Sequence, residues 1–240
     1  MAAESKNKAA AYRFSRYYAE LQAGPTLTVQ TKRQEPISIH FAQGSICSSC
    51  GLTCLCMVLS AYGLAKPSAL ENMSHRQSGI AADVWRVLGP FFMTGITAPE
   101  LKAAIESLSL PIKLSMRHCT SKTNVAQLAV VSEFAVNCLF KGRFTMLAYA
   151  SLKNRHQHWL TGIGVEGLAV SHAAPAITNV DTLLAIDPAD GIQPFTVSNA
   201  RLRRDVTPRR KASPRWVYEA AGFKSEPVSL VSALCFELLE

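Results

Sequence analysis

The feature that most constrains the fold is a helix without a polar face. Residues 51–62, GLTCLCMVLSAY, are apolar almost all round, and Gly63 followed by Pro67 is typical of a helix end. A helix of this kind is buried on every side. The run is shorter than the ~18 apolar residues that a membrane span needs. The rest of the chain must therefore fold around this helix.

The other predicted elements come as helices first and strands afterwards. A second helix is predicted from Thr97, where the sequence TAPE fits a capping box, and a third over residues 124–139. Short strand-like runs of apolar residues bounded by turn residues predict strands over 144–150, 159–165 and 182–186. Residues 227–239 are predicted to form a last strand or helix. This order predicts an α+β fold, in which a helical half containing the buried helix packs on an antiparallel β-sheet.

Residues 1–36 are predicted to be an N-terminal extension of a single domain that spans residues 37–240. Within the extension, residues 9–23 favour a short helix and residues 27–31 an edge strand. The first twenty residues lack the apolar core of a signal peptide. We therefore expect the chain to be made in the cytoplasm, and any export into a target cell to use a secretion system that carries folded proteins.

The charge balance is basic. The formal net charge is +8, and hydrophobic residues make up 48% of the chain against 18% charged residues, which excludes a disordered protein. Much of the excess lies in residues 201–215, RLRRDVTPRRKASPR, which we predict to be an exposed loop. Such a loop favours acidic partners. Direct binding to nucleic acid or to a membrane is not expected.

Cys50 is the candidate nucleophile. It stands at the head of the buried helix, where unpaired N–H groups and the helix dipole favour a thiolate. Gly51 leaves room for a substrate carbonyl to approach the sulfur. Two alternatives stay open: Cys50 is one more buried cysteine, or Cys47-Ser-Ser-Cys50 is a redox or metal pair. The odd count of seven cysteines argues against a disulfide framework, and no second CxxC completes a zinc site.

A thiol nucleophile also needs a base and a group that orients the base. His158 begins the strand-like run HWLTGIGV and Asp187 follows LLAI, so neighbouring antiparallel strands can set them side by side. His156 is the nearest rival for the base. Gln43, which precedes Cys50 by a short loop, can donate to an oxyanion. The alternative for Gln43 is a solvated loop side chain.

Together these segments resemble the bacteriocin-processing, double-glycine-leader peptidases, a papain-like family of cysteine peptidases. QGSICSSCGLTCLCMVLSAYG, residues 43–63, is similar to the family's glutamine, Cys-Gly and apolar helix ending in Tyr-Gly. HWLTGIGVEG from His158 and IDPADG from Ile186 are similar to its histidine strand and its Asp-Pro turn. ITAPELKAAIESLSLPIKL is similar to a helix and strand of the family. The resemblance covers about residues 43–200.

This resemblance implies a papain-like cysteine peptidase fold with no cofactor and no metal. It assigns Cys50, His158 and Asp187 as catalytic residues and Gln43 to the oxyanion hole. The chain departs from the family at Ser49, where the family has an acidic residue. The separations of 158 − 50 = 108 and 187 − 158 = 29 residues between the catalytic positions are also long.

The expected function is that of a cysteine endopeptidase that cuts proteins after Gly-Gly or other small residues. Free-standing relatives include toxins delivered between bacteria, for instance by type VI secretion. That role implies a protein substrate and an immunity protein that covers the cleft. Two alternatives remain open. One is transglutaminase, deamidase or amide-bond transferase chemistry on the same residues; the other is a non-enzymatic basic binding module, which predicts no reactive thiol.

Overall fold

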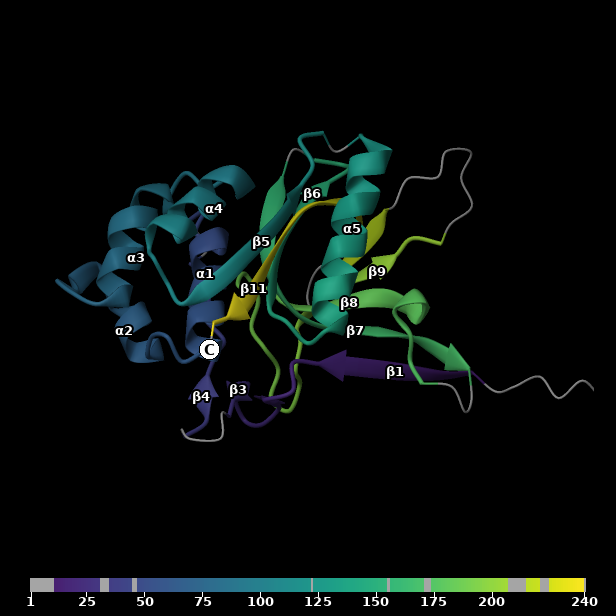
Figure 1. The fold of residues 1–240 in the computed structure, drawn as a ribbon, viewed down its shortest axis with the longest axis horizontal. Coiled ribbons are helices and arrows are strands. Elements are labelled where there is room, and N and C mark those ends of the chain that lie inside the picture. Colours follow the sequence, from purple (N-terminus) through teal and green to yellow (C-terminus); the bar gives the residue numbers. More distant parts are fainter. Residues whose placement is uncertain are drawn as a thin grey trace, which may run out of the picture.

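The computed structural model of the chain is organised around a closed β-barrel (Figure 1). It describes residues 11–30, 35–44, 47–121, 123–154, 156–170, 174–206, 215–220 and 225–239. The barrel strands are β6 (Thr145–Ser151), β7 (Gln157–Val170), β8 (Val180–Ile186), β9 (Ala200–Arg204), β10 (Trp216–Ala220) and β11 (Glu226–Leu238). Each of these strands pairs antiparallel with the next along the chain, and β11 pairs with β6. The six strands are therefore a meander that closes on itself.

The predicted fold class was wrong. We expected a helical half packed on an antiparallel sheet, but the sheet is a closed barrel, and the papain-like fold implied by the resemblance is overturned with it. Alternation along a segment predicts a strand but not its partner, so the same pattern fits an open sheet and a barrel. Closure depends on the long strand β7, which pairs with β6 and β8 and changes register between Gly162 and Gly164 and again after Glu166. Such bulges increase the bend of a strand.

The N-terminal segment belongs to this sheet. The helix predicted over residues 9–23 is instead the strand β1 (Ala11–Tyr17), which pairs antiparallel with β7 and extends the sheet beyond the barrel. A Cβ atom at Gly164 would lie 2.3 Å from the carbonyl oxygen of Arg16, so the close approach of the two strands requires glycine there. The edge strand predicted over residues 27–31 contains a shorter strand, β3 (Thr28–Val29). A small second sheet is formed by β2 (Leu21–Gln22), β3 (Thr28–Val29) and β4 (Ile37–Ser38).

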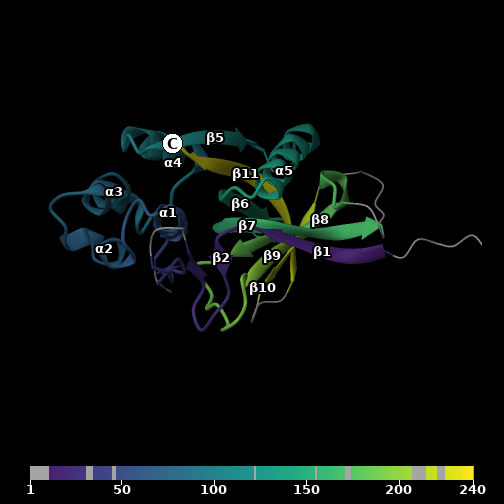
Figure 2. The same ribbon diagram turned by 60° about the horizontal axis from the view of Figure 1, so that its bottom comes forward.

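The helices lie outside the barrel. They are α1 (Cys50–Ala61), α2 (Pro67–Glu71), α3 (Ile80–Leu88), α4 (Ala98–Ser107) and α5 (Val125–Phe140), with short 3-10 turns at Met73–His75, Gly89–Phe91 and Ile177–Asn179. Figures 1 and 2 show α1 to α4 gathered on one side of the barrel. α5 packs against β11, β7, β6 and the remaining strand, β5 (Ile112–His118), which pairs with β11.

The predicted burial of the apolar helix is confirmed. Every residue of α1 is buried, because the helix packs on β7, on β4 and on α2. The predicted start of α4 is also confirmed, since the backbone N–H and the hydroxyl of Thr97 both donate to the carboxylate of Glu100. Within the described ranges, no helix is both long and apolar enough to cross a bilayer.

The basic segment 201–215 is not a loop throughout. Arg201 and Arg203 lie on β9, where both guanidinium groups contact the carboxylate of Glu219 on β10, at 3.0 Å and 2.9 Å. Residues 207–214 lie outside the described residues. Part of the excess positive charge is therefore neutralised on the barrel wall.

Candidate active site

Cys50 is the first residue of α1. The backbone N–H of Thr53 donates to the carbonyl of Ser49 at 2.8 Å, which is the first bond of the helix. The N–H groups of Cys50, Gly51 and Leu52 precede that bond and have no partner within the helix. The Cys50 side chain borders a cleft of about 340 Å³ that Gln43 and His158 also line. An oxygen bound beside the sulfur would thus meet unpaired N–H donors.

The barrel brings His158 and Asp187 together. His158 lies near the start of β7 and Asp187 directly follows β8, and the two strands pair antiparallel with Thr161 opposite Ile186. Nε2 of His158 lies 2.7 Å from Oδ1 of Asp187, and both side chains are buried. Nδ1 is then the ring nitrogen that Asp187 leaves unbound, and His158 lines the same cleft as Cys50.

Sequence reasoning missed the residues that fix Asp187. The hydroxyl of Tyr218, a buried residue of β10, donates to Oδ2 of Asp187, and the backbone N–H of Ala189 donates to Oδ1 at 2.7 Å. Asn199 accepts from the backbone N–H of Asp187 at 2.6 Å and donates to its carbonyl at 3.0 Å. Asn199 and Tyr218 follow Asp187 by 12 and 31 residues in stretches without a motif, so no local signal could have found them.

Neighbouring groups set the pKa values of the pair. Burial lowers the pKa of His158, but its hydrogen bonds with Asp187 and Cys50 outweigh burial and raise it to about 9. Burial raises the pKa of Asp187, but bonds with His158 and Tyr218 hold it below its ordinary value of 3.8. Burial and the nearby carboxylate raise the pKa of Tyr218, so its hydroxyl keeps the proton that it donates. An imidazolium–carboxylate pair is therefore favoured at neutral pH.

Gln43 lies on the wall of the cleft. Its backbone N–H donates to the carbonyl of Pro188 at 2.6 Å, and its side-chain Nε2 donates to the carbonyl of Cys47 at 2.8 Å. Among the described residues, its buried Oε1 has no hydrogen-bond partner. These bonds hold the amide in place, and a primary amide keeps a second N–H for a bound oxygen.

The rival residues occupy different positions. His156 is exposed and stacks on His158 with ring centroids 5.7 Å apart, but the carboxylate of Asp187 contacts His158. Cys47 is a free thiol whose sulfur hydrogen-bonds to the carbonyl of Gly44 and to the hydroxyl of Ser49. In the described part of the chain, no group of three or more His, Cys, Asp or Glu side chains is arranged to hold a metal ion.

Gly51 allows α1 to pack closely behind the cleft. A Cβ atom at this position would lie 2.8 Å from Cγ2 of Ile96 and 3.4 Å from the ring of Trp159. The indole N–H of Trp159 donates to the carbonyl of Ile96 at 3.1 Å, which ties the segment before α4 to β7. Glycine is therefore needed here for helix packing, in addition to any role toward substrate.

A scan of the chain against protein-family models and a search of the curated proteins both found no match. The roles assigned to these residues therefore rest on their geometry and chemistry.

Proposed function

We propose that the protein is a cysteine peptidase in which Cys50 is the nucleophile, His158 the base and Asp187 the orienting carboxylate. One observation carries the proposal: a cysteine at a helix N-terminus shares a cleft with a buried histidine whose other ring nitrogen is held by a carboxylate. Nucleophilic catalysis by a thiol requires this set of groups in this order. A buried structural cysteine does not require a histidine and a carboxylate aligned behind it.

Acylation follows from the positions of the atoms. Sγ of Cys50 attacks the carbonyl carbon of the scissile bond. The proton of the Cys50 thiol is held by Nδ1 of His158 during this attack. The carbonyl oxygen becomes an oxyanion, which the unpaired N–H of Cys50 and the second amide hydrogen of Gln43 stabilise. The C–N bond then breaks, and Nδ1 delivers the proton to the departing amine, so the peptide remains joined to Cys50 as a thioester.

Deacylation reverses these roles. A water molecule attacks the thioester carbon and gives a proton to Nδ1 of His158. The C–S bond breaks, Sγ of Cys50 regains the proton, and the acid product leaves. The sum of the two steps is the addition of one water across one peptide bond, so no oxidant or cofactor is consumed. Asp187 keeps the imidazole in the orientation that both transfers need.

The acyl side of the substrate is proposed to end in a small residue. The support is the resemblance of residues 43–63 to double-glycine-leader peptidases. The test is mass spectrometry of a peptide library, prepared from a digested proteome and incubated with wild type and with Cys50→Ala. We expect new peptide termini, preceded by small residues, with the wild type only.

The products of this experiment separate the reactions. Hydrolysis yields two shorter peptides whose masses add up to the substrate and one water. Deamidation or transglutamination leaves the chain uncut and changes the mass of a glutamine side chain. A library that stays uncut, or is cut equally by Cys50→Ala, would contradict the peptidase. Gln43→Ala is expected to slow turnover by about 10²–10³, the usual cost of losing an oxyanion donor.

A further inference from the structure

A second cavity, of about 460 Å³, opens at one mouth of the barrel. Tyr149 and His158 are directly paired across β6 and β7, and Tyr218 is directly paired with Glu226 across β10 and β11. All four side chains line this cavity. Mouths of barrels are common binding sites.

This barrel-mouth cavity continues the cleft that contains Cys50. Gln43, His156 and His158 line both spaces. A polypeptide bound across the sulfur of Cys50 can therefore extend past the imidazole into the mouth of the barrel. The His158 side chain borders both spaces, whereas Cys50 lines only the cleft and Asp187 only the barrel-mouth cavity.

The chemistry determines which part of a substrate lies there. Nδ1 of His158 must reach the departing amine to protonate it, so that amine is bound beside the imidazole. The residues attached to the amine then continue away from Cys50, beyond His158. The barrel-mouth cavity is thus the space available for the leaving-group side of the scissile bond.

Glu226 gives this cavity a negative charge. Residues directly opposite in an antiparallel pair share a face, so Glu226 faces the same side of the sheet as Tyr218. Its carboxylate accepts a hydrogen bond from the hydroxyl of Ser151 at 3.1 Å, and the described residues form no ion pair with it. The other carboxylate of the cavity, Asp187, is already paired with His158. A cationic group in the cavity would therefore meet an anion that no described cation neutralises.

We infer that the barrel-mouth cavity binds the leaving-group side of the substrate and that Glu226 selects a lysine or arginine there. This inference rests on the proposed function and names a substrate class for the same site. Glu226 is a specificity-determining residue, not a catalytic one, since it contacts neither the reacting carbonyl nor Cys50.

The test uses peptides built on one cut site taken from the library digest. Three peptides keep the same acyl side and carry Lys, Gln or Glu as the first residue after the cut bond. For wild type we expect kcat/KM to be about three- to fivefold higher for Lys than for Gln, the range of a partly exposed ion pair. The Glu peptide should be the poorest of the three, and added salt should reduce the differences.

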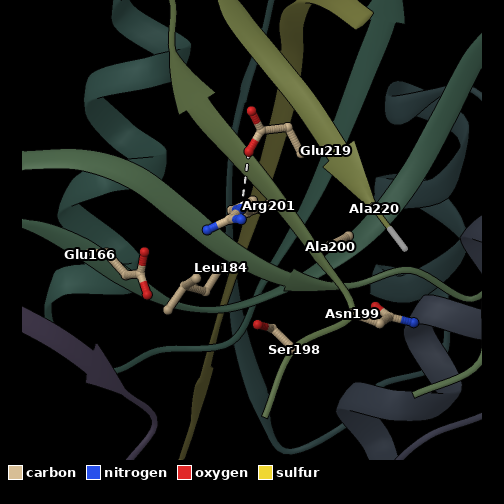
Figure 3. A pocket seen from close by; sticks show the side chains of 8 residues that line it. All are labelled: Glu166, Leu184, Ser198, Asn199, Ala200, Arg201, Glu219 and Ala220. Atoms are coloured by element: carbon tan, nitrogen blue, oxygen red, sulfur yellow. Dashed lines mark ion pairs between the residues drawn. The ribbon is translucent and has the colours of Figure 1, made fainter. Parts of the chain in front are cut away.

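Glu226→Gln keeps the shape of the side chain and the bond from Ser151 while it removes the charge. It is expected to bring the Lys-to-Gln ratio of kcat/KM to about one. The matched control is Glu219→Gln, which removes a carboxylate from the outer wall of the barrel. Figure 3 shows Glu219 beside Arg201 in a separate pocket. This control should keep the wild-type ratio.

The outcomes distinguish the inference from the proposed function. Cleavage by wild type without a preference for Lys, or a preference that Glu226→Gln retains, overturns the inference and leaves the peptidase standing. A wild type that cuts no peptide in the library overturns both. If Glu226→Gln unfolds, the charge series and its salt dependence on wild type still decide the question.

Discussion

Replacing Tyr218 with phenylalanine removes one hydrogen bond to Asp187 and keeps the ring. The ring stacks on Tyr149 with centroids 4.8 Å apart, and both tyrosines are buried, so the packing of the barrel mouth is conserved in the variant. The change removes the bond that the hydroxyl donates to Oδ2 of Asp187, together with its interaction with the hydroxyl of Tyr149.

The magnitude follows from the surroundings of Oδ2. Oδ1 of Asp187 also bonds to His158 and to the N–H of Ala189, but among the described residues Oδ2 accepts only from Tyr218. Phenylalanine thus leaves a buried, charged oxygen without a donor, which places the loss at the upper end of the range for such bonds, about 3 kcal/mol. At about 2–4 °C per kcal/mol for a chain of this size, the melting temperature should fall by about 6–12 °C.

The same change should alter His158. A carboxylate that loses a donor becomes a stronger acceptor for the remaining one, so the pKa of His158 is expected to rise above its wild-type value of about 9. Thermal unfolding by circular dichroism measures the first effect, and NMR titration of the ¹⁵N-labelled histidine rings measures the second. Neither assay needs a substrate.

Tyr62→Phe is the matched control. Its hydroxyl donates to the carbonyl of Phe236 at 2.8 Å, far from the pair, so the variant should lose only about 1 kcal/mol and leave the titration of His158 unchanged. A Tyr218→Phe variant that melts at the wild-type temperature, or in which His158 titrates as it does in wild type, would contradict the role assigned to the Tyr218 hydroxyl.

Three further predictions concern the same region. The raised pKa of His158 stabilises the folded protein fully below pH 6.5, and this contribution is lost as the pH rises through about 9. The free energy of unfolding should fall by about 3 kcal/mol over that range. The lowered pKa of Asp187 stabilises the folded protein above pH 3.8, and that contribution is lost at lower pH. Urea unfolding at a series of pH values checks both limits, and a flat profile from pH 6.5 to 9 would contradict the pair. Gly51→Ala should cost about 1–3 kcal/mol by overpacking against Ile96, and Ile96→Ala in the same chain should restore part of the loss; simple additivity would rule out the contact. Asn199→Ala should cost about 2–3 kcal/mol, because the backbone N–H and carbonyl of Asp187 lose their partner, and unchanged stability would mean that water replaces the amide.

The sequence determined the features that depend on short stretches of chain. A helix that is apolar on every side must be buried, so the placement of α1 in the core was predictable from residues 51–62 alone. The cap at Thr97 and the N-cap at Asn124 likewise follow from local hydrogen bonds. Cys50 at the head of α1 was therefore identifiable as a candidate nucleophile, and the strand-like flank of His158 favoured it over His156 as the candidate base.

Only the tertiary structure decided how the strands pair and what surrounds Asp187. The β1 segment reads locally as a helix, but its pairing with β7 outweighs that preference because a sheet edge offers partners for its backbone. Closure of the barrel by β7 and β8 brings β10 over Asp187, and this alone makes Tyr218 a donor to the carboxylate. Alternation along a strand fixes which side chains share a face. Register and closure fix which side chains meet, and they depend on contacts between segments far apart in the chain.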